Sequence, residues 1–377
     1  MTMENNNTDA TRDQNLSGSS AGRRGNKVTS FYDIENCYKF ILGRPINEDE
    51  RNAIGQNLLQ LTDIPLAEHR RRFLSSNEFH ERHGELIFDN FVPRSIFVLF
   101  ETRYNFKLYL DLRQYHISFG IMNGEYEKFD IDLVKAILPD NGQLIDVGGN
   151  VGYYSLSAAA HPSFRGTVLA FEPLPKLWDL FNRSIMENGF EDRVSVRQLA
   201  LADAPGELQL NDAENTVNAG ATRLVTNAAD NRVGRMTKVE TLDHVIGNLR
   251  PDVMKVDIEG AEGLFLKGAQ RTITAHKPSL LMEINRDMLG VLSKTSPGAI
   301  YRHLSERGYH IWTSEQKQLT QIATADELDE NFPVGAVANI LAVHGDRTDE
   351  VGERVQRLGL TLRPAKAKRQ RVKEAAL

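Results

Sequence analysis

The stretch LIDVGGNVGYY, residues 144–154, decides the fold. A short apolar run ends beside Asp146, and three glycines then follow within five residues, at Gly148, Gly149 and Gly152. In an open α/β sheet, ligands bind where a strand passes through such a turn into a helix, at the carboxyl edge of the sheet. We therefore expect this stretch to be a strand, a ligand-binding turn and the start of a helix.

Further apolar runs of strand length follow and predict an α/β fold with a doubly wound sheet. Each run ends near glycine or an acid, and helical patterns separate most of them. Residues 203–240 interrupt this alternation with a stretch rich in Gly, Ala and Asn, which we interpret as a mobile loop beside the site. The predicted strands span residues 144–147, 168–171, 194–199, 253–256 and 279–284.

The glycine turn does not match a dinucleotide site. Such a site requires the pattern G-x-G-x-x-G, with the pyrophosphate on the helix N-terminus. Counted from Gly148, the pattern meets Asn150 and Tyr153 where glycine is required. Counted from Gly149, it fails in the same way. A nicotinamide-dependent oxidoreductase is therefore the weaker interpretation.

Two acids at the ends of successive strands favour S-adenosylmethionine instead. This cofactor has no phosphate, and it presents a sulfonium, an α-ammonium and a ribose diol. Asp146, directly before the glycines, suits the ammonium, and Glu172, which ends the next strand, suits the two ribose hydroxyls. Charge-assisted hydrogen bonds of this kind are among the stronger ones in proteins.

Residues 118–345 resemble the FkbM-type methyltransferases. The resemblance implies a class I methyltransferase fold, Rossmann-like with a seven-stranded sheet, and S-adenosylmethionine as methyl donor. It also implies O-methylation, typically of a sugar or polyketide hydroxyl. One departure is Gly149, where the family often has Ala. The matching segments are IDVGGNVGYYS (145–155), FEP (171–173), VETLD (239–243), KVDIEGAE (255–262), LKGA (266–269) and residues 278–284.

The glycine turn and the resemblance together give a set of expected cofactor-binding residues. They lie in the turn, in the first turn of the following helix and at the end of the second strand. They are Asp146, Gly148, Gly149, Asn150, Gly152, Tyr153, Glu172 and Pro173.

A second group of acids follows the strand at 253–256 and supplies the catalytic candidates. A hydroxyl acceptor needs a base near the carboxyl edge of the sheet, and we expect Asp257 and Glu259 to act there. Glu262, on the same helical face as Glu259, is a candidate substrate contact, and so are Glu283 and Asn285 at the end of the next strand. The alternatives are Mg²⁺ coordination, which we do not favour, and stabilisation of a helix N-terminus. No metal site is assigned.

A small helical module is predicted ahead of this domain. Apolar residues recur at helical spacing from Ile34 to Ile41, Asn47 and Glu50 form a capping box, and a third helix spans 66–74. Arg44 is expected to bridge helices. The segments 38–44 and 76–79 resemble a helical domain of unknown function with an LGR…S-x-EF pattern, found in bacterial surface-glycan and secreted proteins. This second resemblance implies an interaction role and favours a glycan acceptor.

These features predict five regions along the 377 residues. They are a disordered tail (1–27), the helical module (28–84), a strand-rich connector (85–124), the methyltransferase domain (125–345) and a C-terminal extension (346–377). Within the connector, alternating apolar residues indicate strands throughout 95–121.

Composition narrows the functional classes. The net charge of −6 argues against a nucleic-acid partner, and no apolar run reaches the roughly 18 residues that span a bilayer. The single cysteine and the polar N-terminus point to the cytoplasm. Residues 361–377 carry six basic side chains against one acid; we interpret them as solvated, with weak contact to an anionic membrane as the alternative. A non-catalytic glycan-assembly scaffold remains the alternative function.

Overall fold

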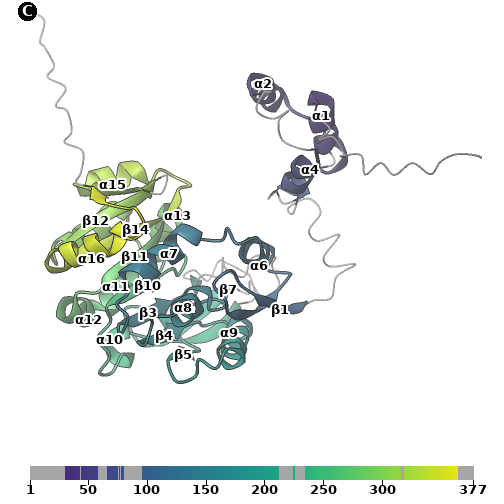
Figure 1. Cartoon of the computed structure of the whole chain (residues 1–377). Coiled ribbons are helices and arrows are strands. Elements are labelled where there is room, and N and C mark those ends of the chain that lie inside the picture. The colour runs from purple at the N-terminus through teal and green to yellow at the C-terminus, as the bar shows by residue number, and fades with distance from the viewer. Residues whose placement is uncertain are drawn as a thin grey trace, which may run out of the picture. The chain divides into compact units, whose positions relative to one another are not determined.

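The computed structural model describes residues 30–42, 44–57, 66–74, 76, 78–79, 96–211, 224–225, 234–315 and 318–363. The chain divides into two units, residues 1–91 and 92–377 (Figure 1). The predicted tail 1–27 and the basic residues 366–373 lie outside the described residues.

The first unit contains the helices α1 (Phe31–Phe40), α2 (Glu48–Gln56) and α4 (Leu66–Leu74). The predicted capping box is confirmed, because the Asn47 side chain accepts the Glu50 backbone N–H while the Glu50 carboxylate accepts that of Asn47. Arg44 forms ion pairs with Glu50 and Glu78, so its predicted bridging role is confirmed too.

The second unit begins with a hairpin of β1 (Phe97–Glu101) and β2 (Lys107–Asp111), as the alternating pattern predicted. The strand interpretation is wrong for the residues that follow, because α6 (Tyr115–Met122) is a helix. Ile117 and Ile121, four residues apart, are both buried in the core. That spacing places them on one face of a helix. The strand-like alternation up to residue 112 concealed the change to helical spacing that follows it.

A nine-stranded sheet forms the centre of this unit, and most of its central pairs are parallel. Its order is β15-β13-β12-β14-β11-β10-β3-β4-β5. The seven strands from β12 to β5 are the predicted class I sheet, and β13 and β15 extend it by two. The strands are β3 (Gln143–Val147), β4 (Thr167–Phe171), β5 (Val194–Arg197), β10 (Val253–Val256), β11 (Ser279–Asn285), β12 (Tyr309–Glu315), β13 (Gln318–Ile322), β14 (Val337–His344) and β15 (Leu362–Arg363).

Helices cover both faces of this sheet, because successive residues of each strand point to opposite sides. Leu144 packs in one apolar cluster and Ile145 in the other. The first cluster holds α7 (Lys128–Ile137), α8 (Tyr153–Ala159), α9 (Pro175–Glu187) and α16 (Thr348–Gln356). The second holds α10 (Leu242–Val245), α11 (Glu262–Gly268), α12 (Gln270–His276), α13 (Arg286–Leu292), α14 (Pro297–Ser305) and α15 (Ala325–Asn331).

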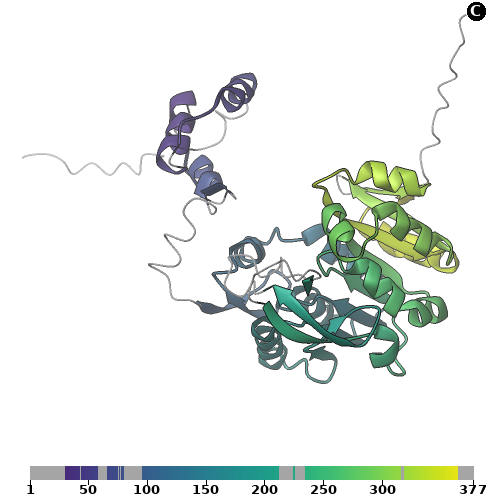
Figure 2. The same cartoon turned by 180° about the vertical axis from the view of Figure 1, so that it is seen from behind.

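A separate four-stranded sheet corrects the interpretation of residues 203–240 as a loop (Figure 2). Its order is β6-β9-β7-β8, and β7 and β9 pair as an antiparallel ladder. Residues 212–223 and 226–233 lie outside the described residues. The strands are β6 (Ala200–Leu201), β7 (Gly206–Asn211), β8 (Leu224–Val225) and β9 (Gly234–Glu240).

Across the described part of the chain, no helix is both long enough and apolar enough to cross a membrane.

Candidate functional site

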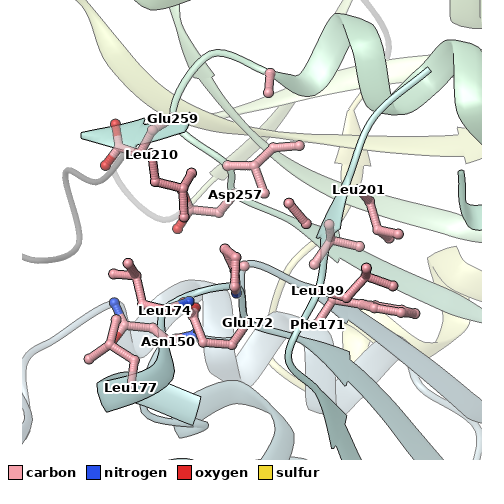
Figure 3. A pocket seen from close by; sticks show the side chains of 16 residues that line it. Asn150, Phe171, Glu172, Leu174, Leu177, Leu199, Leu201, Leu210, Asp257 and Glu259 are labelled. Carbon is pink, nitrogen blue, oxygen red and sulfur yellow. The ribbon is translucent and has the colours of Figure 1, made fainter. Parts of the chain in front are cut away.

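A pocket opens at the carboxyl edge of the large sheet, where the strand order reverses between β3 and β10. In Figure 3, Asp257 and Glu259 face Glu172 and Asn150 across it, and the small sheet contributes Leu210. Of the predicted residues, Gly148, Asn150, Glu172, Pro173, Asp257 and Glu259 line the pocket.

The glycine turn is held against both neighbouring strands. The backbone N–H groups of Gly148 and Gly149 donate to the carbonyl oxygen of Phe171, at 3.0 and 2.9 Å. Gly148 has a φ of +80°, and a Cβ there would lie 1.9 Å from the carbonyl oxygen of Asp257. Only glycine can therefore occupy this position without moving the Asp257 loop.

Glu172 directly follows β4 and is 5% exposed. Its Oε2 accepts the backbone N–H of Asn150 at 2.9 Å, and its Oε1 accepts that of Leu174 at 2.8 Å. Burial raises the pKa of this carboxyl to about 7, although both hydrogen bonds and Lys255 act in the opposite direction. The predicted acid is thus in the pocket wall, and its carboxyl also fixes the turn.

Asp146 is fully buried and lies behind the turn, outside the pocket lining. Its Oδ2 accepts a hydrogen bond from Ser155 Oγ at 2.6 Å, while Oδ1 has no partner among the described residues. Burial raises the pKa of this carboxyl, and Lys255, its partner in register on β10, opposes the shift.

Three further residues predicted to bind the cofactor also lie outside the pocket lining. Tyr153 is 3% exposed and packs in the first apolar cluster against the ring of Phe106. Gly149 and Gly152 abut the ring of Phe181, on α9. Their absent side chains let that helix approach the turn.

Two acids after β10 and one on β11 form a close group. Asp257, Glu259 and Glu283 each offer a carboxylate oxygen, and these atoms lie within 4.8 Å of one another. Burial and the two neighbouring carboxylates raise the pKa of Glu283 to about 10. The raised pKa favours the protonated form of Glu283, and the three oxygen atoms are close enough to one another to hold a cation.

Glu262 and Asn285 make local contacts instead. The Glu262 carboxylate is fully buried and accepts the backbone N–H groups of Ile258 and Gly260, at 3.2 and 3.1 Å. It thus holds the Asp257–Glu262 loop in shape. The Asn285 side chain accepts the N–H of Met288 and caps α13. Neither side chain lines the pocket.

The comparisons with known proteins agree with this arrangement. The family model described as Methyltransferase FkbM domain matches residues 146–311, which contain the turn, Glu172 and the acid group. Residues 146–311 form an FkbM methyltransferase domain.

The chain is also similar to known proteins over part of their length. Methyltransferase sdnD of Sordaria araneosa is 30% identical, over 35% of this chain and 62% of its own. The AMB antimetabolite synthetase AmbE of Pseudomonas aeruginosa is 24% identical, over 72% of this chain and 14% of its own. A solved structure, methyltransferase FkbM from Methylobacillus flagellatus, is 19% identical, covers 55% of this chain and 47% of its own, and gives a TM-score of 0.35. The chain thus spans less than two thirds of each of these relatives.

The site also contains residues that the sequence did not predict. Leu199 and Leu201, after β5, and Leu210, on β7, line the pocket. Glu127, the N-cap of α7 with a φ of +44°, lies near Lys255 and Asp257, and burial raises its pKa. Lys255 carried a usable signal, because a lysine among Val253, Met254 and Val256 places a charge on a buried strand. An acid before a helix, such as Glu127, carries no such signal.

Proposed function

We propose that the FkbM domain transfers a methyl group from S-adenosylmethionine to a hydroxyl of a sugar or glycan acceptor, with polyketide-like hydroxyls as the second acceptor class. One observation carries the proposal: Glu172 after β4 and Asp257 after β10 line one pocket inside this domain. The described residues that line it include three acids and no basic side chain. Such a lining suits a cationic cofactor without phosphate.

Different residues of the pocket wall are suited to bind different parts of the cofactor. The Glu172 carboxylate, already ordered by two backbone N–H groups, is placed to accept the ribose hydroxyls. Phe171, Leu199 and Leu201 supply an apolar wall for an adenine ring. Asn150 also lines the pocket, and its Oδ1 has no hydrogen-bond partner among the described residues. This oxygen is therefore a further hydrogen-bond acceptor for the cofactor. Asp146 contributes its negative field from behind the turn.

Asp257 is our candidate for the base. When bound, S-adenosylmethionine supplies a methyl group on a sulfonium that is already a good leaving group. The chain must therefore orient the acceptor and remove its proton. Lys255 Nζ donates to Oδ2 of Asp257 at 3.2 Å, so we assign Oδ1 to receive the hydroxyl proton. We assign Glu283, whose raised pKa favours the protonated form, to donate a hydrogen bond to the acceptor, and Glu259 to accept one.

Two sequence features supply the finer parts of this proposal. The helical module resembles a domain found in bacterial surface-glycan proteins, which favours a glycan acceptor. The single cysteine, Cys37, supports a cytoplasmic place of action, because such a chain relies on no internal disulfide.

The first test is calorimetric titration of the full chain with S-adenosylhomocysteine. We expect micromolar binding for the wild type, weakened roughly 10- to 100-fold by Glu172→Ala. Glu187→Ala, which removes a surface ion pair with Lys107 on the same unit, is the matched control and should bind normally. Absence of binding by the wild type would overturn the cofactor assignment.

The second test identifies the acceptor atom. The protein is incubated with S-adenosylmethionine carrying an isotope-labelled methyl group and with panels of saccharides and polyketide alcohols. Transfer should give a product with a methoxy carbon resonance. Label found only on nitrogen or carbon would contradict the O-methylation proposal and leave the cofactor site intact.

A further inference from the structure

Lys255 is a buried cation in the centre of the sheet. It lies on β10 and is 6% exposed, between Met254 and Val256, which pack on the opposite face. Removing an ammonium group from water is costly unless charged and hydrogen-bonding partners replace the lost solvation. The partners of Lys255 therefore indicate what its charge is used for.

Those partners belong to two walls of the cofactor pocket. Lys255 Nζ donates to the carbonyl oxygen of Gly148 and to Oδ2 of Asp257, each at 3.2 Å. It also lies 5.0 Å from the centre of the Tyr154 ring. Gly148 and Asp257 both line the pocket, so one ammonium group joins the glycine turn to the candidate base.

The charged groups that act most strongly on this ammonium are carboxylates from three neighbouring segments. Asp146 on β3, Glu127 before α7 and Asp257 after β10 all attract it. Glu283 on β11 also interacts with it. If the lysine charge were removed, the negative charges of Asp146, Glu127 and Asp257 would act on the pocket without this compensation.

We propose that Lys255 is a positioning residue that holds the Asp257 carboxylate against the glycine turn and sets the pocket's preference between sulfonium and thioether forms of the cofactor. The inference rests on the proposed function. S-adenosylmethionine and S-adenosylhomocysteine differ by a methyl group and one positive charge. The ratio of their dissociation constants therefore reports the local field, whereas a general loosening of the pocket weakens both.

The experiment measures both ligands on the full chain by calorimetry. Lys255→Met keeps most of the side-chain length and removes the charge. We expect it to shift the ratio of dissociation constants roughly 10-fold in favour of S-adenosylmethionine, since the acids then act on the sulfonium unopposed. Lys255→Arg keeps the charge and should stay within about twofold of the wild-type ratio. Lys255→Gln, neutral but still a hydrogen-bond donor, replaces the Met variant if that protein does not fold.

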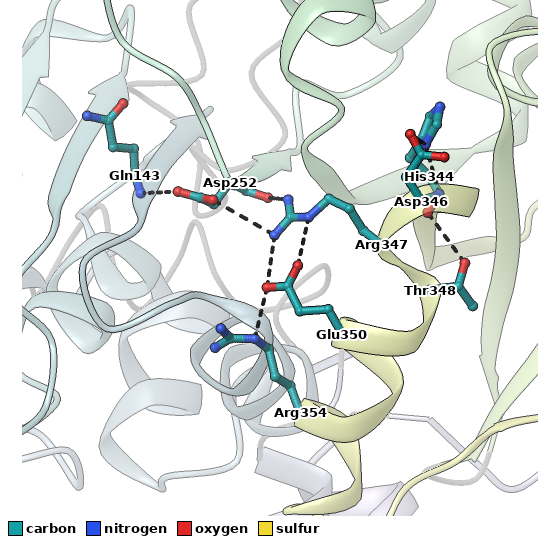
Figure 4. Close-up of polar contacts among 8 residues, drawn as sticks. All are labelled: Gln143, Asp252, His344, Asp346, Arg347, Thr348, Glu350 and Arg354. Carbon is teal, nitrogen blue, oxygen red and sulfur yellow. Dashed lines mark hydrogen bonds and ion pairs between the residues drawn. The ribbon is translucent and has the colours of Figure 1, made fainter.

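Arg347 provides a matched control at the other end of the same strand. Figure 4 shows its guanidinium between Asp252, directly before β10, and Glu350 on α16. Its Nη1 donates to the carbonyl oxygen of Asp252 at 2.7 Å, and its side chain is 14% exposed. Arg347→Met also deletes a largely buried cation, so it should lower the melting temperature and leave the ligand ratio unchanged.

Each outcome has a distinct meaning. A folded Lys255→Met or Lys255→Gln protein with the wild-type ratio would overturn the inference, because Lys255 would then be structural, as Arg347 is. The inference would also be overturned if Lys255→Arg shifted the ratio of dissociation constants as much as Lys255→Met does. The loss of the lysine charge would then not be the cause of the shift. If the wild type binds neither ligand, the cofactor assignment fails, and the inference fails with it.

Discussion

Oε2 of Glu172 accepts the backbone N–H of Asn150 at 2.9 Å, which joins the end of β4 to the turn after β3. One carboxyl thus forms part of the pocket wall and fixes the turn beside it. Its ionisation should affect both ligand binding and folding.

The first prediction concerns pH and Glu172. An ionised carboxylate is the stronger acceptor for ribose hydroxyls, and burial raises this pKa to about 7. The affinity for S-adenosylhomocysteine should therefore rise roughly 10-fold between about pH 6 and about pH 8. Glu172→Gln should bind more weakly and without this pH dependence, as calorimetry at several pH values would show. A wild type with constant affinity over this range would contradict the prediction.

The raised pKa of Glu172 has the opposite effect on stability, which should fall as the pH rises. The pKa is raised from 4.5 to about 7, so the folded chain holds the proton more tightly than the unfolded chain. The stabilisation is present below pH 4.5 and is lost as the pH rises through about 7. In urea titrations without ligand, the free energy of unfolding should fall over this window by about 2–3 kcal/mol more in the wild type than in Glu172→Gln.

The second prediction concerns Gly148. In Gly148→Ala, the new methyl group would meet the Asp257 carbonyl oxygen at 1.9 Å, at a φ of +80°. We expect a loss of at least about 3 kcal/mol in unfolding free energy, together with loss of cofactor binding. Gly189→Ala is the control, because Gly189 has a φ of +63° and open space around it. It should cost only about 1 kcal/mol and leave binding intact. If Gly148→Ala and Gly189→Ala lost the same unfolding free energy in urea titrations, the close approach of Gly148 to the Asp257 carbonyl oxygen would be contradicted.

The third prediction concerns Asp257. Loss of a general base should lower turnover roughly 100- to 10,000-fold, while Asp257→Asn should change the affinity for S-adenosylhomocysteine only slightly. The measurement is the initial rate at saturating acceptor. Asp179→Asn, at an exposed position on α9, should retain full activity. Unchanged turnover in Asp257→Asn would remove the base assignment.

The fourth prediction concerns metal. Asp257, Glu259 and Glu283 are close enough to hold an ion, but the positive charge of Lys255 already contacts Asp257 and opposes the binding of a cation there. We therefore expect methyl transfer to continue at its full rate in the presence of EDTA. Activity that is lost with EDTA and restored by Mg²⁺ would instead identify the three carboxylates as metal ligands.

Buried strands were the most predictable part of this fold. The runs at 144–147, 168–171 and 253–256 are strands with nearly the same bounds in the structure, because a strand covered on both faces is mostly apolar, and Asp146 and Lys255 are the charged exceptions among them. Residues that follow such strands necessarily lie at the carboxyl edge. Glu172 and Asp257 were therefore placed in the pocket correctly.

Side-chain direction and the small sheet were harder to predict. Neither Asp146 nor Tyr153 lines the pocket, and for Tyr153 the reason is its packing in the first apolar cluster, which the sequence does not reveal. Strands β7 and β9 pair mainly with each other, so neither carries the continuous apolar pattern of a buried strand. Their composition resembled that of a loop, and the contribution of Leu210 was missed.

The small sheet also has a consequence for how this pocket can change in evolution. Leu210 reaches the pocket from β7, whereas Glu172 and Asp257 follow strands of the large sheet. Substitutions at Leu210 therefore alter one wall of the pocket without disturbing the strands that place these two acids. The two sides of the pocket are thus free to vary separately.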